Sequence, residues 1–220
     1  MGERTVFLDI ETIPSQSPTL LAQFMADVKA PAQYKKEDSI EKWLSENHEA
    51  AARERLAKTS FDPAHGHICA IAYATNDGGV LSNCIERLSD EAHLLELFFD
   101  DIRSFHSTTF VGHYISGFDL RFIINRAVVL GVPIPACIPR DVKPWGKGIF
   151  DTMTAWAGNR DTISLDNLCK ALSIEGKGNF DGSQVAAAWL AGEHDKIAEY
   201  CRDDVEKVRH IYKRFEAVGY

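Results

Sequence analysis

Two acids stand two positions apart near the N-terminus, where Asp9 and Glu11 interrupt an otherwise apolar run over residues 6–13. A strand places residues i and i+2 on one face, so both carboxylates project from the same face about 6–7 Å apart. Aspartate is disfavoured inside strands, and carboxylates without a counter-charge are costly to bury. A hard divalent cation such as Mg²⁺ or Mn²⁺ takes oxygen ligands and would relieve their repulsion. An edge strand with both acids facing water is the alternative that this stretch leaves open.

The composition indicates a globular chain. Its 220 residues are 45% apolar, which suits one large domain or one domain with an insertion. The formal net charge of −8 argues against a broad basic surface for nucleic acid but allows a local basic groove. Five scattered cysteines without CxxC spacing indicate free buried thiols in a reducing compartment rather than a zinc site.

The sequence also bears on the compartment. Its apolar runs all fall short of the ~20 residues that span a bilayer. Acidic residues come too early in the chain for a secretory signal. We therefore expect a cytoplasmic protein with no membrane partner.

The elements that must position these acids follow from periodicity and turn residues. Two helical patterns, at about 19–29 and 36–58, predict a helical insertion at about 18–60. Two strand-forming runs, 68–75 and 80–87, flank a turn at 76–79 and predict an antiparallel hairpin. Later segments predict a helix over about 89–103, strands at 108–112 and 149–151, and helices at 164–171 and 183–191. Together they predict an α/β fold with a central sheet of about five strands.

Two more acids occupy positions where chemistry is common. Asp119 stands where the turn after Thr108–Gly112 enters a helix, at the strand end where open α/β sheets bind ligands. On the last expected helix, about 194–217, Tyr200 and Asp204 are four residues apart and share a face. Asp203 points elsewhere and is expected to be a solvated neighbour.

These residues form three ordered motifs, which are Asp9 to Pro14, Gly112 to Asp119, and Tyr200 to Asp204. The set resembles the DEDD superfamily of 3′–5′ exonucleases. The resemblance is greatest to the stand-alone proteins related to the exonuclease domain of family-B DNA polymerases. Because the position of the alternative histidine holds Glu199, the tyrosine subclass is indicated.

The resemblance implies a ribonuclease H-like fold, with a central mixed five-stranded sheet flanked by helices, as a single exonuclease domain over residues 1–220. It implies four carboxylates that hold two Mg²⁺ or Mn²⁺ ions. Asp9 would bridge both ions, Glu11 and Asp204 would complete the site for the nucleophile's ion, and Asp119 would serve the second ion. Two such ions stabilise the entering and leaving oxygens of an in-line displacement. Tyr200 would orient the attacking water.

The implied reaction releases nucleoside monophosphates from the 3′ end of single-stranded or frayed nucleic acid, with DNA favoured and a role in DNA repair. Two alternatives stay open. One is a nucleic-acid-binding or partner-docking module with the same fold and little turnover. The other is an exoribonuclease that acts on short RNA, because no contact to a 2′-hydroxyl can be assigned.

Three neighbouring features are less specific. Tyr114 stands where related sequences often have asparagine, which leaves substrate handling near Asp119 open. For Asp151 we favour support of the metal ligands or fixing of the loop over direct metal ligation. Trp145, with Lys143 and Lys147 beside it, could stack on or steer a single strand, or could belong to a solvated loop.

Overall fold

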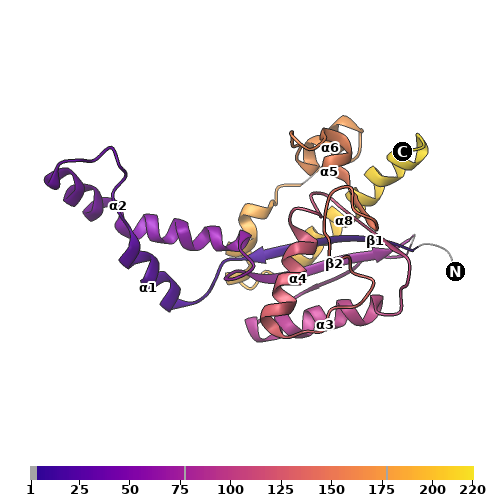
Figure 1. The fold of residues 1–220 in the computed structure, drawn as a ribbon, viewed down its shortest axis with the longest axis horizontal. Helices are drawn as coiled ribbons and strands as arrows, with labels where there is room; N and C mark the ends of the chain where they lie inside the picture. The colour runs from indigo at the N-terminus through magenta and orange to yellow at the C-terminus, as the bar shows by residue number, and fades with distance from the viewer. Residues whose placement is uncertain (1–3, 77, 177) are drawn as a thin grey trace. The chain divides into compact units, whose positions relative to one another are not determined.

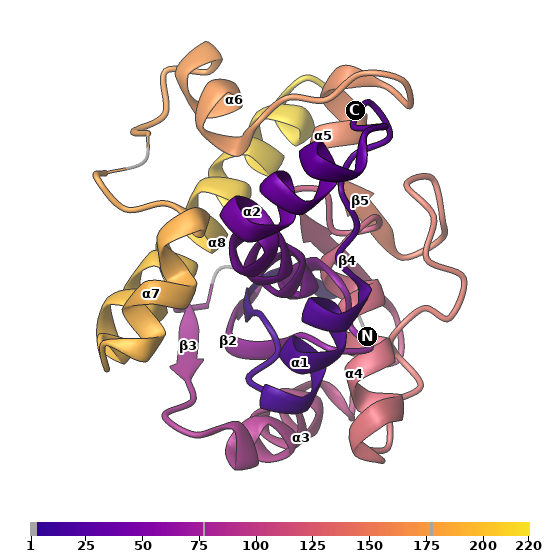
Figure 2. The same ribbon diagram turned by 90° about the vertical axis from the view of Figure 1, so that its left-hand side faces the viewer.

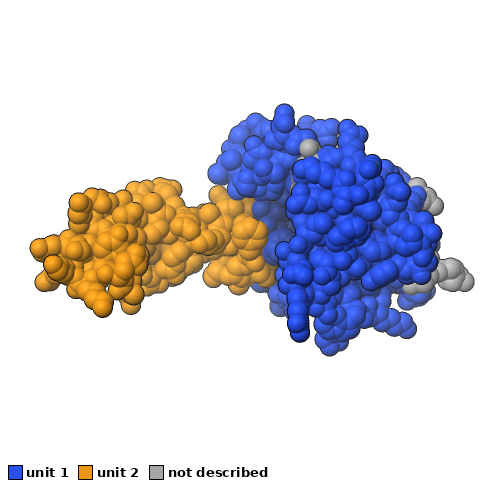
Figure 3. All heavy atoms as spheres, turned by 90° about the horizontal axis from the view of Figure 1, so that it is seen from above, with its two compact units in different colours: residues 1–12, 68–220 blue, residues 13–67 orange. Residues whose placement is uncertain are grey.

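The computed structural model describes residues 4–76, 78–176 and 178–220 and divides into two compact units (Figure 3). Unit 1 comprises residues 1–12 and 68–220, and unit 2 comprises residues 13–67. The helical unit is thus wider than the insertion expected at about 18–60. A single exonuclease domain that carries this insertion stays a prediction.

A five-stranded mixed sheet forms the centre of unit 1, in the order β3-β2-β1-β4-β5. Its strands are β1 Arg4–Ile13, β2 His67–Thr75, β3 Leu81–Cys84, β4 Thr108–Gly112 and β5 Ile149–Asp151. β1 runs parallel to β4, and β4 runs parallel to β5, whereas β2 and β3 are antiparallel. The strand that carries Asp9 and Glu11 is therefore the central one, and the alternative of an exposed edge strand is wrong.

Helices flank the sheet on both faces (Figures 1 and 2). α3 Glu91–Ile102 and α4 Asp119–Leu130 lie on one face, and α8 His194–Ala217 lies along the other. The ring of Phe98 in α3 packs 4.9 Å from that of Tyr73 in β2, and the ring of Tyr212 in α8 packs 5.6 Å from that of Phe7 in β1. The predicted α/β class, with a central mixed five-stranded sheet between helices, is confirmed.

The shorter elements of unit 1 differ in part from the expectation. α6 Leu165–Ala171 and α7 Val185–Leu190 fall where helices were predicted, and 3-10 turns at Leu88–Asp90 and Gly182–Gln184 precede α3 and α7. The second hairpin strand is shorter than the predicted 80–87, and the turn expected at 76–79 includes Asp77, which lies outside the described residues. α5 Thr152–Ala157 was not predicted, because six residues are too few to show a helical period.

Unit 2 consists of α1 Pro18–Asp27, α2 Glu37–Ala57 and a 3-10 turn, Lys58–Phe61. Ser17 caps α1 by accepting a hydrogen bond from the N–H of Leu20, and Pro18 opens the helix. The two helices pack together, since the Arg55 guanidinium lies 4.5 Å from the ring centroid of Phe24. Both helical patterns of the sequence are thus present. Across the described parts of both units, we find no helix with the length and apolarity needed to cross a membrane.

Candidate active site

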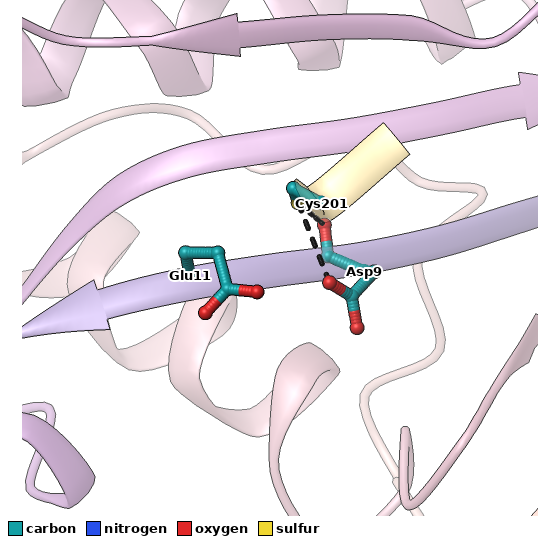
Figure 4. Close-up of side chains that lie close together, drawn as sticks. All are labelled: Asp9, Glu11 and Cys201. Atoms are coloured by element: carbon teal, nitrogen blue, oxygen red, sulfur yellow. Dashed lines mark hydrogen bonds between the residues drawn. The ribbon is translucent and has the colours of Figure 1, made fainter. Parts of the chain in front are cut away.

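Phe7 and Asp9 of β1 contact Tyr212 and Cys201 of α8, so Glu11, which alternation places on the same face of the strand, lies on the side of α8. The Asp9 carboxylate accepts a hydrogen bond from the Cys201 thiol of α8, with 3.3 Å between Oδ2 and Sγ. Carboxylate oxygens of Asp9 and Glu11 and the sulfur of Cys201 all lie within 4.8 Å of one another (Figure 4). Within the ranges 4–76, 78–176 and 178–220, no other group of three potential ligands is as close.

Asp119 reaches the same region from the first turn of α4. β1 continues past the end of β4, because their register runs from Arg4 opposite Thr108 to Phe7 opposite Val111. The backbone N–H of Ile10 donates a hydrogen bond to Asp119 Oδ1 at 3.2 Å. This contact ties the third carboxylate, which is only 4% exposed, to the strand between the first two.

Tyr200 and Asp204 share the buried face of α8, whereas Arg202 and Asp203 are exposed. The phenol of Tyr200 makes a side-chain hydrogen bond with Asp204. The Asp204 charge acts on Asp9, which places Asp204 within electrostatic reach of the β1 acids. All five residues expected at the site therefore lie in one region, although Asp119 and Asp204 stand outside the tight group around Cys201.

The acids of this region act on one another. Burial, and then the charges of Glu11, Asp119 and Asp204, raise the pKa of Asp9 well above its usual range. Burial raises the pKa of Asp119 to about 7. A hard divalent cation would reverse both effects, and four carboxylates from three elements are the oxygen donors that Mg²⁺ and Mn²⁺ prefer. The donor set fits such ions.

Asp203 is not merely the solvated neighbour that the sequence indicated. It forms an ion pair with Lys207, whose ammonium group also lies 3.3 Å from Asp204 Oδ1. The Lys207 side chain is 5% exposed, whereas that of Asp203 is 55% exposed. Lys207 follows Asp204 by three residues and so shares its side of α8. That spacing is the sequence signal that would have identified it.

Two cysteines for which the sequence predicted only free, buried thiols form hydrogen bonds to the backbone of the site. The Cys69 thiol donates to the carbonyl of Glu11 at 3.4 Å, and the Cys201 thiol also reaches the carbonyl of Asp9 at 3.4 Å. Burial, and then the charge of Asp9, raise the pKa of Cys201, so its thiol acts as a hydrogen-bond donor. The position of Cys201 next to Tyr200 was the available signal.

Asp151 fixes the loop over residues 113–118, which joins β4 to α4. Its carboxylate accepts hydrogen bonds from the N–H groups of Tyr114 at 3.0 Å and Ser116 at 3.1 Å, and from the Ser116 hydroxyl at 2.6 Å. It also caps α5 through the N–H groups of Met153 and Thr154. These bonds give Asp151 the loop-fixing role that the sequence favoured.

Comparison with known proteins identifies the family. Residues 60–219 match the family described as predicted 3′–5′ exonucleases related to the exonuclease domain of PolB. The match includes Asp119, Tyr200 and Asp204 but begins after β1. No curated protein matches the sequence.

One similar solved structure is the family B DNA polymerase from the hyperthermophilic archaeon Pyrobaculum calidifontis. It has a TM-score of 0.61 and 16% sequence identity over 97% of this chain, which corresponds to 24% of the polymerase chain. At that identity the likeness concerns the fold, which is ribonuclease H-like. Because the family model covers most of the sequence, the chain belongs to the family of predicted 3′–5′ exonucleases related to the exonuclease domain of PolB.

Proposed function

We propose that the protein is a 3′–5′ exonuclease that releases nucleoside monophosphates from the 3′ end of single-stranded or frayed DNA. The observation that carries this proposal is the convergence of Asp9, Glu11, Asp119 and Asp204 from three elements. Acids that raise one another's pKa reduce stability, so their grouping is best explained by a ligand of opposite charge.

The four carboxylates of Asp9, Glu11, Asp119 and Asp204 would hold two Mg²⁺ or Mn²⁺ ions. When bound, such ions acidify a water and stabilise charge on the entering and leaving oxygens of an in-line displacement. The chain's own contribution is to fix the ligands. Cys201 orients Asp9, and the N–H of Ile10 orients Asp119.

Tyr200 would position the attacking water. Burial, and then the charge of Asp204, raise the pKa of its phenol above the usual value, so the hydroxyl keeps its proton at neutral pH. A protonated phenol that donates to Asp204 cannot serve as the base, but its oxygen can accept a hydrogen bond from the water. Its hydrogen bond with Asp204 holds the ring in place.

The family implies a nucleic-acid substrate, and a single strand with a free 3′ end is the form we propose. A buried site on a β-strand admits the flexible end of a single nucleic-acid strand more readily than a rigid duplex.

The five cysteines are all free, which supports a cytoplasmic location.

Digestion of end-labelled oligonucleotides tests the proposal. With Mn²⁺, a 5′-labelled single strand should shorten stepwise, a 3′-labelled one should first release a labelled mononucleotide, and chelation should stop both. Asp9→Asn should abolish shortening, whereas Asp195→Asn, an exposed acid on the same helix as Tyr200, should not. Equal digestion by Asp9→Asn, or release from the 5′ end first, would contradict the assignment. RNA of the same sequence tests the choice of polymer.

A further inference from the structure

A groove of about 430 Å³ lies beside the loop over residues 113–118, within unit 1. Two exposed aromatic side chains line it, Tyr114 at 47% and Trp145 at 69% exposure. Because the loop 113–118 leads directly into Asp119, the groove and the candidate active site share one segment of chain.

Tyr114 is held in an unusual conformation at this groove. Its φ is +65°, in the left-handed region that bulky residues rarely adopt. The bond from its N–H to Asp151 secures the backbone there. A Cβ on Gly117 would lie 2.3 Å from ring atoms of Tyr114, so glycine at 117 is what admits the ring. Local strain that keeps an aromatic ring half exposed indicates a role in binding.

Trp145 lies in a loop whose backbone is fixed by hydrogen bonds. The Arg121 guanidinium of α4 donates to the carbonyl of Val142 at 3.3 Å, which ties the 132–148 loop to α4. A turn then follows, closed by a 2.8 Å hydrogen bond from the N–H of Gly146 to the carbonyl of Lys143. Trp145 lies inside this turn, so the bond to Val142 before the turn and the bond that closes the turn fix the backbone at Trp145.

The charges around the groove are mostly positive, although the chain as a whole carries −8. Arg121 and Arg160 line it, together with one acid, Asp161. The adjoining segment 139–148 adds Arg140, Lys143 and Lys147 against a single acid, Asp141. Aromatic faces stack on bases, and guanidinium groups bind phosphates, so this combination suits a single nucleic-acid strand better than an apolar peptide.

We propose that this groove binds unpaired bases and phosphates of a single-stranded DNA whose 3′ end enters the candidate active site. Tyr114 and Trp145 stack on the bases, and Arg121 and Arg160 contact the phosphates. The inference rests on the proposed exonuclease function, because it is that function which brings a 3′ end to Asp119.

The test measures fluorescence polarisation of a labelled oligothymidylate, and of an abasic strand of equal length, in chelator so that no strand is cut. Trp145→Ala should bind the oligothymidylate about 5- to 100-fold more weakly, which corresponds to the loss of stacking on one base, and should bind the abasic strand as the wild type does. Trp156→Ala is the matched control, because Trp156 is 47% exposed and does not line the groove. Its binding should not change.

Tyr114→Asn separates binding from folding. Asparagine tolerates the left-handed region better than tyrosine, so the variant should keep or raise the melting temperature while it weakens oligothymidylate binding. Log affinity falls as log salt concentration rises, and Arg121→Gln should make this slope less steep by about 0.7, as expected for one lost phosphate contact on a single strand.

Several results would overturn the groove assignment: equal wild-type affinity for the thymidylate and abasic strands, equal losses in Trp145→Ala and Trp156→Ala, or tighter binding of RNA than of DNA. Hydrolysis of thymidine 5′-(p-nitrophenyl phosphate) with Mn²⁺ distinguishes the two proposals, because this ester is too short to reach the groove. If the ester is cleaved but the groove variants bind like wild type, the groove fails alone. If they lose binding but neither ester nor DNA is cleaved, the exonuclease function fails alone.

Discussion

Two buried acidic regions of unit 1 have opposite surroundings. Glu91, at the start of α3, is 1% exposed and forms an ion pair with Arg126 of α4 at 2.7 Å. It also accepts a hydrogen bond from the N–H of Ile68 at 2.9 Å. Asp9, by contrast, is acted on by the charges of three other acids, and its carboxylate accepts a hydrogen bond from the weakly polar thiol of Cys201.

The difference separates a structural acid from a functional one. The chain itself supplies the counter-charge of Glu91, so this acid fixes α3 against α4 without any ligand. Lys207 lies beside Asp204, whereas Asp9 is acted on mainly by other acids and gains most from a charge that comes from outside the chain. A substitution should therefore lower stability at the first region and lower activity at the second.

The largest expected effect is on activity at the second region. Asp9→Asn should lower the rate of DNA shortening by about 10⁴-fold, since metal ions supply several kcal/mol of transition-state stabilisation and each 1.4 kcal/mol is tenfold. Rates measured with saturating Mn²⁺ test this. Glu91→Gln, assayed well below its melting temperature, should retain activity; a comparable loss there would break the distinction.

A smaller loss is expected for Tyr200→Phe. Removal of the hydroxyl that positions the water should cost about 10²-fold in rate, at the lower end for positioned proton-handling groups. The affinity for Mn²⁺, measured by calorimetry, should not change. Full activity in this variant would remove Tyr200 from the mechanism.

Stability should respond at the first region. Arg126→Met leaves the buried Glu91 without its partner and should destabilise the fold by about 3–5 kcal/mol. The melting temperature should fall by about 6–20 °C at roughly 2–4 °C per kcal/mol for a chain of this size. The double variant Glu91→Leu with Arg126→Met should recover much of the loss. An unchanged melting temperature in Arg126→Met would show that the ion pair is not structural.

The smallest effect has the opposite sign. Asp119→Asn should stabilise the metal-free protein at neutral pH by about 1–2 kcal/mol, because it removes one buried charge from the acid group. Thermal unfolding in chelator measures this. The same variant should be inactive with Mn²⁺. A lower melting temperature would mean that Asp119 serves the fold rather than the site.

The pH dependence of the wild type follows from the same shift. In the folded protein the pKa of Asp119 is raised to about 7, whereas an unfolded aspartate titrates near 3.9. Between about pH 4 and 7 the unfolded chain therefore binds fewer protons than the folded one, and metal-free stability falls as pH rises through this window. Asp119→Asn should flatten that decline in melting temperature.

The sequence predicted the fold where local pattern and periodicity carry the information. The strand around Asp9 and Glu11 and the shared helix face of Tyr200 and Asp204 both follow from residue spacing. Contacts between segments that are distant in the sequence could not be predicted in this way. The bonds from Cys69 to Glu11 and from Asp151 to Tyr114 join residues that no periodicity links.

Two local features escaped prediction for other reasons. α5 is only six residues long, and its start depends on capping by Asp151, which also serves the 113–118 loop. The left-handed conformation of Tyr114 contradicts the preference of tyrosine and is imposed by tertiary contacts. Such departures from local preference concentrate around Asp119, where the function is proposed to reside.

The central claim is that the acids around Asp9 bind a metal ion. Thermal unfolding of the wild type and of Asp9→Asn, with and without Mn²⁺, tests it most directly. At a Mn²⁺ concentration about 100 times the dissociation constant, the wild type should gain about 2.7 kcal/mol, or roughly 5–10 °C in melting temperature. Asp9→Asn should gain little. An equal rise in both proteins, or none in the wild type, would contradict the account.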